Sequence, residues 1–216
     1  MSQNLTAAEY AKHKLLMAAI KLFGESGVDA VSLREINRVS GAKNNSALHY
    51  HFKNKLGLVT AVINFIQAEF NSQRGPGLAA LEIKAKTKPL SVEEIMKLII
   101  DPYVAIIENY DWGFNAVRAV ARIEFDGDLE ILKILNQTSE PDAKTMTRML
   151  KVLLPELPTK LLKQRINYAV KSIIHGFADH KNLEQSYLGD LTMNKLSKLA
   201  DFHLGMTVAI LTAPNN

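Results

Sequence analysis

The chain has 216 residues, of which 47% are apolar and 22% charged, proportions that exclude a disordered chain and a fibrous repeat. It has no cysteine, which excludes a disulfide scaffold and a cysteine-based zinc site. The net charge of +4 is unevenly placed: residues 1–60 hold eight Lys and Arg against four Asp and Glu, whereas residues 61–216 hold eighteen of each. This asymmetry predicts a polyanion-binding N-terminal segment and a neutral remainder.

Apolar runs in the sequence are far too short to span a membrane. The segment from Met1 to Glu9 lacks the basic stretch and apolar stretch of a secretory signal. We therefore expect a cytoplasmic protein without a membrane partner.

The first predicted helix covers residues 7–25. Thr6 and Glu9 have capping-box spacing, in which a hydroxyl and a carboxylate each bind an unpaired backbone N–H at the helix start. Apolar residues then recur at helical spacing, and Gly27 offers a stop.

Two short helices are predicted next. Ser32 and Glu35 repeat the capping-box spacing, and the second helix ends at Gly41. Asn44 or Asn45 can cap a third helix that reaches about residue 51. Two short helices joined by a glycine turn and braced by a longer helix form a helix-turn-helix unit.

The rest of the chain also shows helical spacing, and no stretch has sustained strand alternation. Asn54 can cap a long helix that we expect the glycines and proline of residues 75–77 to break. Pro102 is expected to kink a later helix, because it lacks an N–H and clashes one turn back. Further helices are predicted over 91–107, 114–125, 129–154, 158–177 and 191–211. The fold class is therefore all-α.

Residues 10–70 resemble the DNA-binding domain of the TetR family of transcriptional regulators. The residues that carry the likeness are Ser32, Ile36, Gly41, Tyr50, His51, Phe52 and Lys55. Asn37 and Ser40 stand where small apolar residues are usual in that family. The resemblance implies an N-terminal three-helix helix-turn-helix DNA-binding domain over 7–70, with its motif at about 32–52. A C-terminal helical effector-binding and dimerisation domain would cover 71–216.

The resemblance and the charge asymmetry together point to double-stranded DNA as a partner. A helix fits the major groove, and its first exposed residues reach base edges. Base contacts are expected from Lys43, Asn44, Asn45, Ser46, Ala47 and His49. Phosphate contacts are expected from Ser32, Arg34, Tyr50, His51 and Lys55.

The sequence predicts no metal and no cofactor. The run from His49 to His51 has no carboxylate or cysteine beside it to complete a metal site. His175, Asp179 and His180 have only loose ligand spacing.

A single helix-turn-helix reads only a few base pairs, so we expect a homodimer on a pseudo-palindromic operator. The last two long helices are the best candidates for the subunit interface. Their apolar residues are Ile166, Val170, Ile173, Ile174 and Phe177, then Leu196, Leu199, Phe202, Met206, Val208, Ile210 and Leu211. The alternative is that these side chains fill the core of the monomer.

The resemblance further implies a small-molecule effector held by the middle helices. Candidate lining residues are Tyr103, Ile107, Trp112, Phe114, Arg118, Arg122, Met146, Met149 and Tyr168. Most of them are equally explained as core residues, with methionine as an adaptable filler. Arg118 and Arg122 could bind an acidic ligand, but the acidic residues at 124, 126 and 128 offer ion pairs, which is the interpretation we prefer.

These features predict a transcriptional regulator, by family habit a repressor released from its operator by a small-molecule effector. The alternative is a helical DNA-binding architectural protein without an effector. An enzyme is not expected, because the sequence has no Gly-rich phosphate loop, paired-carboxylate motif, nucleophile elbow or His-Glu-x-x-His motif.

Overall fold

The computed structural model describes residues 6–41, 46–193 and 195–214. Across these residues the chain forms helices and no strand, which confirms the all-α prediction. The helices are α1 (Ala7–Ser26), α2 (Leu33–Ser40), α3 (Ser46–Phe52), α4 (Lys55–Lys84), α5 (Val92–Asn109), α6 (Gly113–Asp126), α7 (Leu129–Leu153), α8 (Thr159–Asp179), the 3₁₀ helix η1 (His180–Gln185) and α9 (Leu196–Thr212). None of them, within the described part of the chain, is long and apolar enough to cross a membrane.

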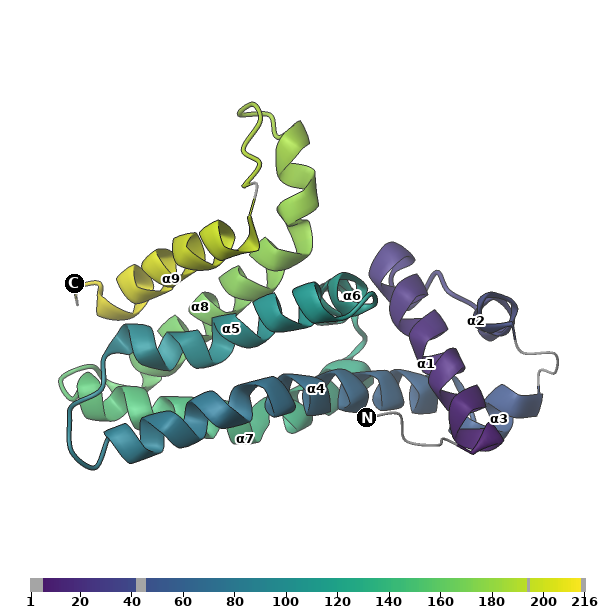
Figure 1. Ribbon diagram of the computed structural model, residues 1–216, viewed down its shortest axis with the longest axis horizontal. Helices are drawn as coiled ribbons and strands as arrows, with labels where there is room; N and C mark the ends of the chain where they lie inside the picture. The colour runs from purple at the N-terminus through teal and green to yellow at the C-terminus, as the bar shows by residue number, and fades with distance from the viewer. Residues whose placement is uncertain (1–5, 42–45, 194, 215–216) are drawn as a thin grey trace. The chain divides into compact units, whose positions relative to one another are not determined.

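The helices labelled in Figure 1 divide into two compact units. Unit 1 comprises residues 1–67 and 112–138, and unit 2 comprises residues 68–111 and 139–216. Helices α4 and α7 contribute residues to both units. Helix α6 therefore belongs to the same unit as α1, α2 and α3.

In unit 1, α1 begins at the predicted capping box. The Thr6 hydroxyl accepts a hydrogen bond from the Glu9 N–H at 3.3 Å, and the Glu9 carboxylate accepts one from the Thr6 N–H at 2.9 Å. The prediction for this helix start is confirmed. Gly27 follows the helix with φ of 82°, a backbone conformation that favours glycine.

The packing of α1 on α6 depends on a glycine. A Cβ atom at Gly24 would lie 2.5 Å from the carbonyl oxygen of Asn115, so only glycine permits this approach. The Gly24 carbonyl lies in the last turn of α1, where it has no partner within the helix. The Arg122 Nε of α6 donates to it at 3.2 Å. One arginine therefore caps α1 and holds it to α6.

The prediction that residues 75–77 break the fourth helix is wrong. Helix α4 runs through them, from Lys55 to Lys84, with Pro76 inside it. A proline ring clashes with the Cβ of the preceding residue in a helix, and Gly75 has no Cβ. The helix therefore loses one backbone hydrogen bond at Pro76 and is otherwise continuous.

In unit 2, a row of stacked rings connects three helices. The Tyr103 ring of α5 lies 5.7 Å from the Phe177 ring of α8, and Phe177 lies 5.5 Å from the His203 ring of α9. A Cβ at Gly176 would lie 2.1 Å from the imidazole of His203. The glycine thus forms a notch in α8 that receives the histidine of α9.

The last helix begins later than predicted, at Leu196 and not at residue 191. The preceding segment uses local side-chain hydrogen bonds instead. The Asp190 carboxylate accepts from the Thr192 N–H at 2.8 Å, and Gly189 has φ of 100°. Such bonds compete with helix formation, which explains the late start.

Candidate functional site

Helix α2 presents its first turn to solvent. The Ser32 hydroxyl caps the helix by accepting from the Glu35 N–H at 3.2 Å, and both Ser32 and Arg34 are exposed. This end of the helix has unpaired N–H groups and the positive end of the helix dipole beside an arginine, a combination that attracts phosphate. Asn37 of α2 is buried.

Helix α3 carries five of the predicted contact residues, and the side chains of three of them, His49, Tyr50 and His51, are described. The Tyr50 ring is 82% exposed, so its burial contributes little to the packing of unit 1. His51 is half-buried and its ring lies 5.1 Å from that of Tyr50. A large amphipathic ring left in water at this position suits a contact with a partner.

The His49 imidazole is exposed, and its orientation is set by the end of α3. Its Nδ1 lies 2.9 Å from the backbone carbonyl oxygen of Lys53. Because a carbonyl oxygen only accepts, Nδ1 is the donor in this bond, and Nε2 is the ring nitrogen that can face a partner.

The turn between α3 and α4 is tight. Lys53 adopts φ of 65°, and its N–H donates to the His49 carbonyl at 3.0 Å. Asn54 caps α4 as predicted, because its side-chain oxygen accepts from the Gly57 N–H at 2.8 Å. A Cβ at Gly57 would lie 2.0 Å from the Phe52 carbonyl oxygen, so this turn requires glycine.

Lys55, predicted to contact phosphate, has a partner inside unit 1. Its Nζ donates to the backbone carbonyl of Asp29 at 3.3 Å and so ties the start of α4 to the segment between α1 and α2. Its side chain therefore has a structural contact in addition to its predicted role.

The remaining predicted base contacts are only partly described. Lys43, Asn44 and Asn45 lie outside the described residues. Ser46 and Ala47 begin α3, but their side chains are also outside the described part.

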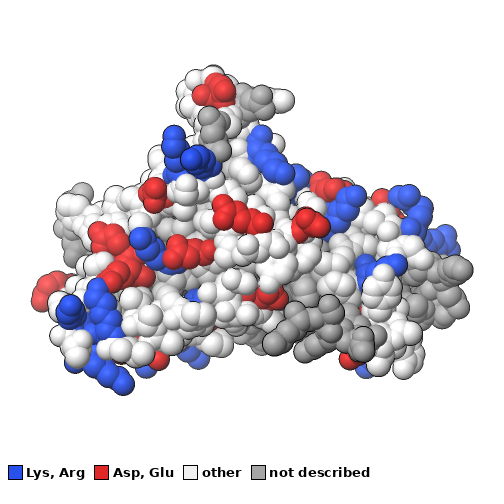
Figure 2. Space-filling model, viewed as in Figure 1, with Lys and Arg blue, Asp and Glu red and all other residues white. Residues whose placement is uncertain are grey.

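On one face of the molecule the charged side chains are dispersed. On the face shown in Figure 2, Lys and Arg side chains alternate with Asp and Glu without forming one continuous basic patch. The excess of four positive charges in residues 1–60 is consistent with contacts by individual side chains, such as Arg34, to phosphates.

The residues predicted to line an effector site are divided between the two units. Trp112, Phe114, Arg118 and Arg122 belong to unit 1, where the Arg118 guanidinium lies 5.7 Å from the Phe114 ring centre. The others belong to unit 2. There Tyr103 is buried in the ring stack, Ile107 is half-buried and Tyr168 is 67% exposed.

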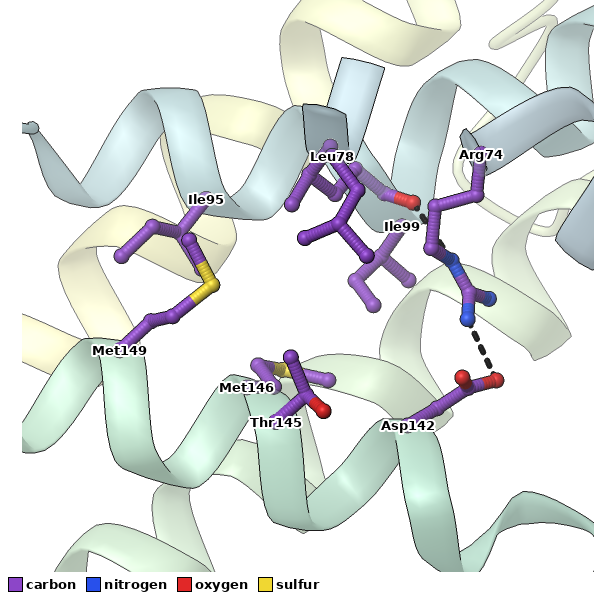
Figure 3. Close-up of a pocket in the computed structure, with 9 residues that line it drawn as sticks. Arg74, Leu78, Ile95, Ile99, Asp142, Thr145, Met146 and Met149 are labelled. Carbon is purple, nitrogen blue, oxygen red and sulfur yellow. Dashed lines mark hydrogen bonds and ion pairs between the residues drawn. The ribbon is translucent and has the colours of Figure 1, made fainter. Parts of the chain in front are cut away.

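A cavity of about 40 Å³ lies in unit 2 between α4, α5 and α7 (Figure 3). The predicted residues Met146 and Met149 line it. Its apolar wall consists of Leu78, Ile95, Leu98, Ile99, Met146 and Met149, and its polar residues are Arg74, Asp142 and Thr145.

Arg74 reaches the cavity from α4 and has three partners within unit 2. Its guanidinium forms an ion pair with Asp142 of α7 and donates to the Asn71 side-chain oxygen at 3.3 Å. Its Nε donates to the backbone carbonyl of Leu98 at 3.0 Å.

A proline explains the last of these bonds. Pro102 lies inside α5 and has no N–H to donate to the carbonyl four residues before it, which is that of Leu98. The carbonyl is thereby left for Arg74. Helix α5 continues through Pro102, from Val92 to Asn109, and Arg74 satisfies the freed acceptor.

Two parts of the chain match known protein families. Residues 15–62 match the family described as bacterial regulatory proteins of the tetR family. Residues 97–208, just over half of the chain, match the family described as tetracyclin repressor-like C-terminal domains. The chain belongs to the TetR family of transcriptional regulators.

Solved structures of TetR regulators share its fold. A TetR-family regulator from Rhodococcus sp. is 13% identical with a TM-score of 0.61, covering 94% of this chain and 99% of that one. FadR from Bacillus subtilis, solved in complex with stearoyl-CoA, is 17% identical with a TM-score of 0.61, covering 94% and 100%. PfmR from Thermus thermophilus is 12% identical with a TM-score of 0.59, covering 98% and 99%. No curated protein sequence matches the chain.

Sequence reasoning missed the polar residues of the cavity in this TetR-family chain. Arg74 and Asp142 lie far apart in the sequence, and no local motif connects them. The available signal was Pro102, whose missing N–H indicates a free carbonyl, but the sequence does not show which donor binds it. Among the described residues, no group of three or more His, Asp or Glu side chains is placed to hold a metal ion.

Proposed function

We propose that this TetR-family regulator is a sequence-specific DNA-binding repressor, acting in the cytoplasm as a homodimer on a pseudo-palindromic operator. A small-molecule effector releases it from that operator. The observation that carries the proposal is the pair of short helices α2 and α3, which expose Arg34 and Tyr50 within the region that matches the family's N-terminal domain.

The chemistry of the exposed groups indicates which of them contact phosphate and which contact bases. Arg34 and the capped start of α2 supply a cation and N–H donors for phosphate oxygens. The Tyr50 hydroxyl can donate to a neighbouring phosphate. The start of α3 and the residues just before it would then face base edges in the major groove.

The effector part of the proposal is supported by the cavity in unit 2. An apolar wall with a few polar side chains at one end is the usual construction of a small-molecule site. FadR from Bacillus subtilis is recorded in complex with stearoyl-CoA, so at least one protein of this fold holds a small-molecule ligand. An effector that binds one arrangement of the protein more tightly than another shifts its DNA affinity.

The test is selection of bound sequences from random duplex DNA, followed by affinity measurements at several salt concentrations. We expect one enriched, pseudo-palindromic sequence, bound far more tightly than random DNA and less tightly as salt rises. Equal affinity for every duplex would support an architectural protein instead, and no binding at low salt would remove both functions.

Substitution of Arg34 tests the phosphate contact. Arg34→Ala is expected to weaken binding to all sequences alike and to reduce the slope of log affinity against log salt by about 1. Asn45→Ala, at a predicted base-reading position outside the described residues, is expected to change base preference instead. Lys163→Ala, an exposed residue of α8, is the matched control and should change neither quantity. Arg34→Ala binding like the control would contradict the assignment.

A further inference from the structure

We infer that the cavity in unit 2 accepts a short apolar carboxylate, whose carboxylate group takes the place of Asp142 on Arg74. This inference rests on the proposed function, because it names the chemical class of the effector. It is drawn from the way the ion pair is built at one end of an apolar wall (Figure 3).

Arg74 is fixed in place without the help of Asp142. Its Nε is bonded to the Leu98 carbonyl that Pro102 leaves free, and its Nη1 is bonded to the Asn71 side chain. Its side chain is only 14% exposed. If Asp142 leaves, the guanidinium keeps both contacts and still points at the cavity. It is therefore a preformed anion-binding group, and a guanidinium suits a carboxylate in particular.

Asp142 is the more easily displaced member of the pair. Its side chain is 28% exposed, twice the fraction for Arg74, so the carboxylate can be hydrated after it moves. It follows Pro141, where α7 lacks one backbone hydrogen bond and is easier to bend. A ligand carboxylate would preserve the charge balance around Arg74, whereas loss of Asp142 alone would leave a largely buried cation unpaired.

The opposite exchange, a ligand ammonium in place of Arg74, is disfavoured by the same contacts. The ammonium would have to displace the guanidinium from the Leu98 carbonyl and from Asn71 as well as from Asp142. A neutral ligand would cover the ion pair without replacing either charge, and would gain only apolar contact.

The size of the cavity points to a short ligand. About 40 Å³ holds only a few water-sized groups. Met146 and Met149 line the wall, and the unbranched methionine side chain adapts to a modest change in occupant. The body of the ligand therefore lies against aliphatic and thioether groups with its carboxylate at Arg74.

Replacement of Asp142 by a ligand also changes a contact between two helices. Arg74 lies on α4 and Asp142 on α7, and each of these helices also contributes residues to unit 1. A carboxylate effector would replace a link between two protein helices by a link from one helix to the ligand.

The experiment is isothermal titration calorimetry of the full chain with butanoate, hexanoate and octanoate at constant salt. Hexan-1-ol and hexylamine serve as matched uncharged and cationic probes. We expect saturable binding of at least one acid and weaker or no binding of the alcohol and amine. Arg74→Gln should weaken acid binding at least about tenfold, because it removes a charge-assisted hydrogen bond.

The distinguishing variant is Asp142→Asn, which removes the competing carboxylate. We expect it to tighten acid binding about two- to fivefold, the range set by the modest strength of a partly exposed ion pair. A merely structural ion pair predicts the reverse, a weaker site. Arg148→Gln, an exposed arginine of the same helix, is the control and should leave affinity unchanged.

Circular dichroism shows whether each variant folds. If Arg74→Gln does not fold, the acid affinity of Asp142→Asn decides between the inference and a merely structural ion pair. No binding of any of the three acids, equal binding of the alcohol or amine, or weaker binding by Asp142→Asn overturns the inference. The proposed function is tested separately by the operator selection. A protein that binds an operator but no carboxylate refutes only the ligand class, whereas one that binds carboxylates but no DNA refutes the repressor.

Discussion

The imidazole of His203 is 5% exposed and lies in the notch at Gly176, stacked on Phe177. Its Nδ1 has no hydrogen-bond partner among the described residues. Burial lowers the pKa of His203 below its ordinary value of 6.5, because the charged form cannot be hydrated there. Protonation of this single side chain therefore opposes the packing of α8 on α9.

The pH dependence of stability follows from this shift. As the pH falls below about 6.5, the unfolded chain binds a proton at residue 203 before the folded chain does, so the free energy of unfolding decreases. One such group contributes a slope of up to about 1.4 kcal/mol per pH unit. Urea denaturation at pH 7.5 and 5.5 should show a smaller loss for His203→Gln than for the wild type. An equal loss in the two proteins would contradict this account.

At the scale of the helices, the contact between α8 and α9 depends on a missing side chain. An alanine Cβ at residue 176 would overlap the His203 ring, which is confined by Phe177 and Phe202. Alanine in place of Gly176 gains about 1 kcal/mol in helix propensity. The overlap with the His203 ring outweighs this gain.

We expect Gly176→Ala to lower the free energy of unfolding by about 1–3 kcal/mol, the usual cost of overpacking. Gly205→Ala is the matched control within α9, because a Cβ there meets nothing within 4 Å. It should raise the stability by about 0.5–1 kcal/mol. Urea denaturation at one protein concentration measures the free energy of unfolding of both variants. Two changes of the same sign would contradict the role of Gly176 as a notch.

The sequence predicts helices well where caps and apolar spacing agree, and fails where a neighbouring segment decides. Thr6, Ser32 and Asn54 act within three residues of their partners, so their patterns are visible in the sequence. Residues 75–77 were expected to end a helix, because glycine and proline each disfavour one. Their order matters: glycine before proline removes the clash between the proline ring and the preceding Cβ.

At the scale of the whole molecule, many apolar residues of α8 and α9 belong to the core of the single chain. Six of the apolar residues named for a subunit interface are buried within the single chain: Ile166, Ile173, Ile174, Phe177, Leu199 and Leu211. Phe202 and Met206 remain 49% and 41% exposed, one turn apart on α9. Helical spacing alone cannot separate the two sets, because both recur with the same period.

These exposed side chains predict the outcome of an oligomerisation experiment. Sedimentation analysis should give about twice the 24.0 kDa chain mass for the wild type. Phe202→Glu should shift the protein towards the monomer, because it places a charge in an apolar contact. Phe125→Glu, at an 83% exposed position of unit 1, is the control and should sediment as the wild type does. A monomeric wild-type protein would remove the proposed dimer.

The two candidate sites differ in how far a local sequence pattern can predict them. The exposed residues of α2 and α3 follow from caps and a family pattern within about thirty residues of chain. The cavity brings together residues from 74 to 149, and its charged pair depends on helix packing that no local pattern encodes.

The carbonyl that Pro102 frees makes one contact of Arg74 depend on Pro102. A chain that replaces the proline by another residue restores the backbone N–H, which then competes with the guanidinium for Leu98. A chain that loses the arginine leaves this carbonyl without its donor. In an alignment of this chain with its nearest relatives, we therefore expect these two positions, twenty-eight residues apart, to be gained and lost together.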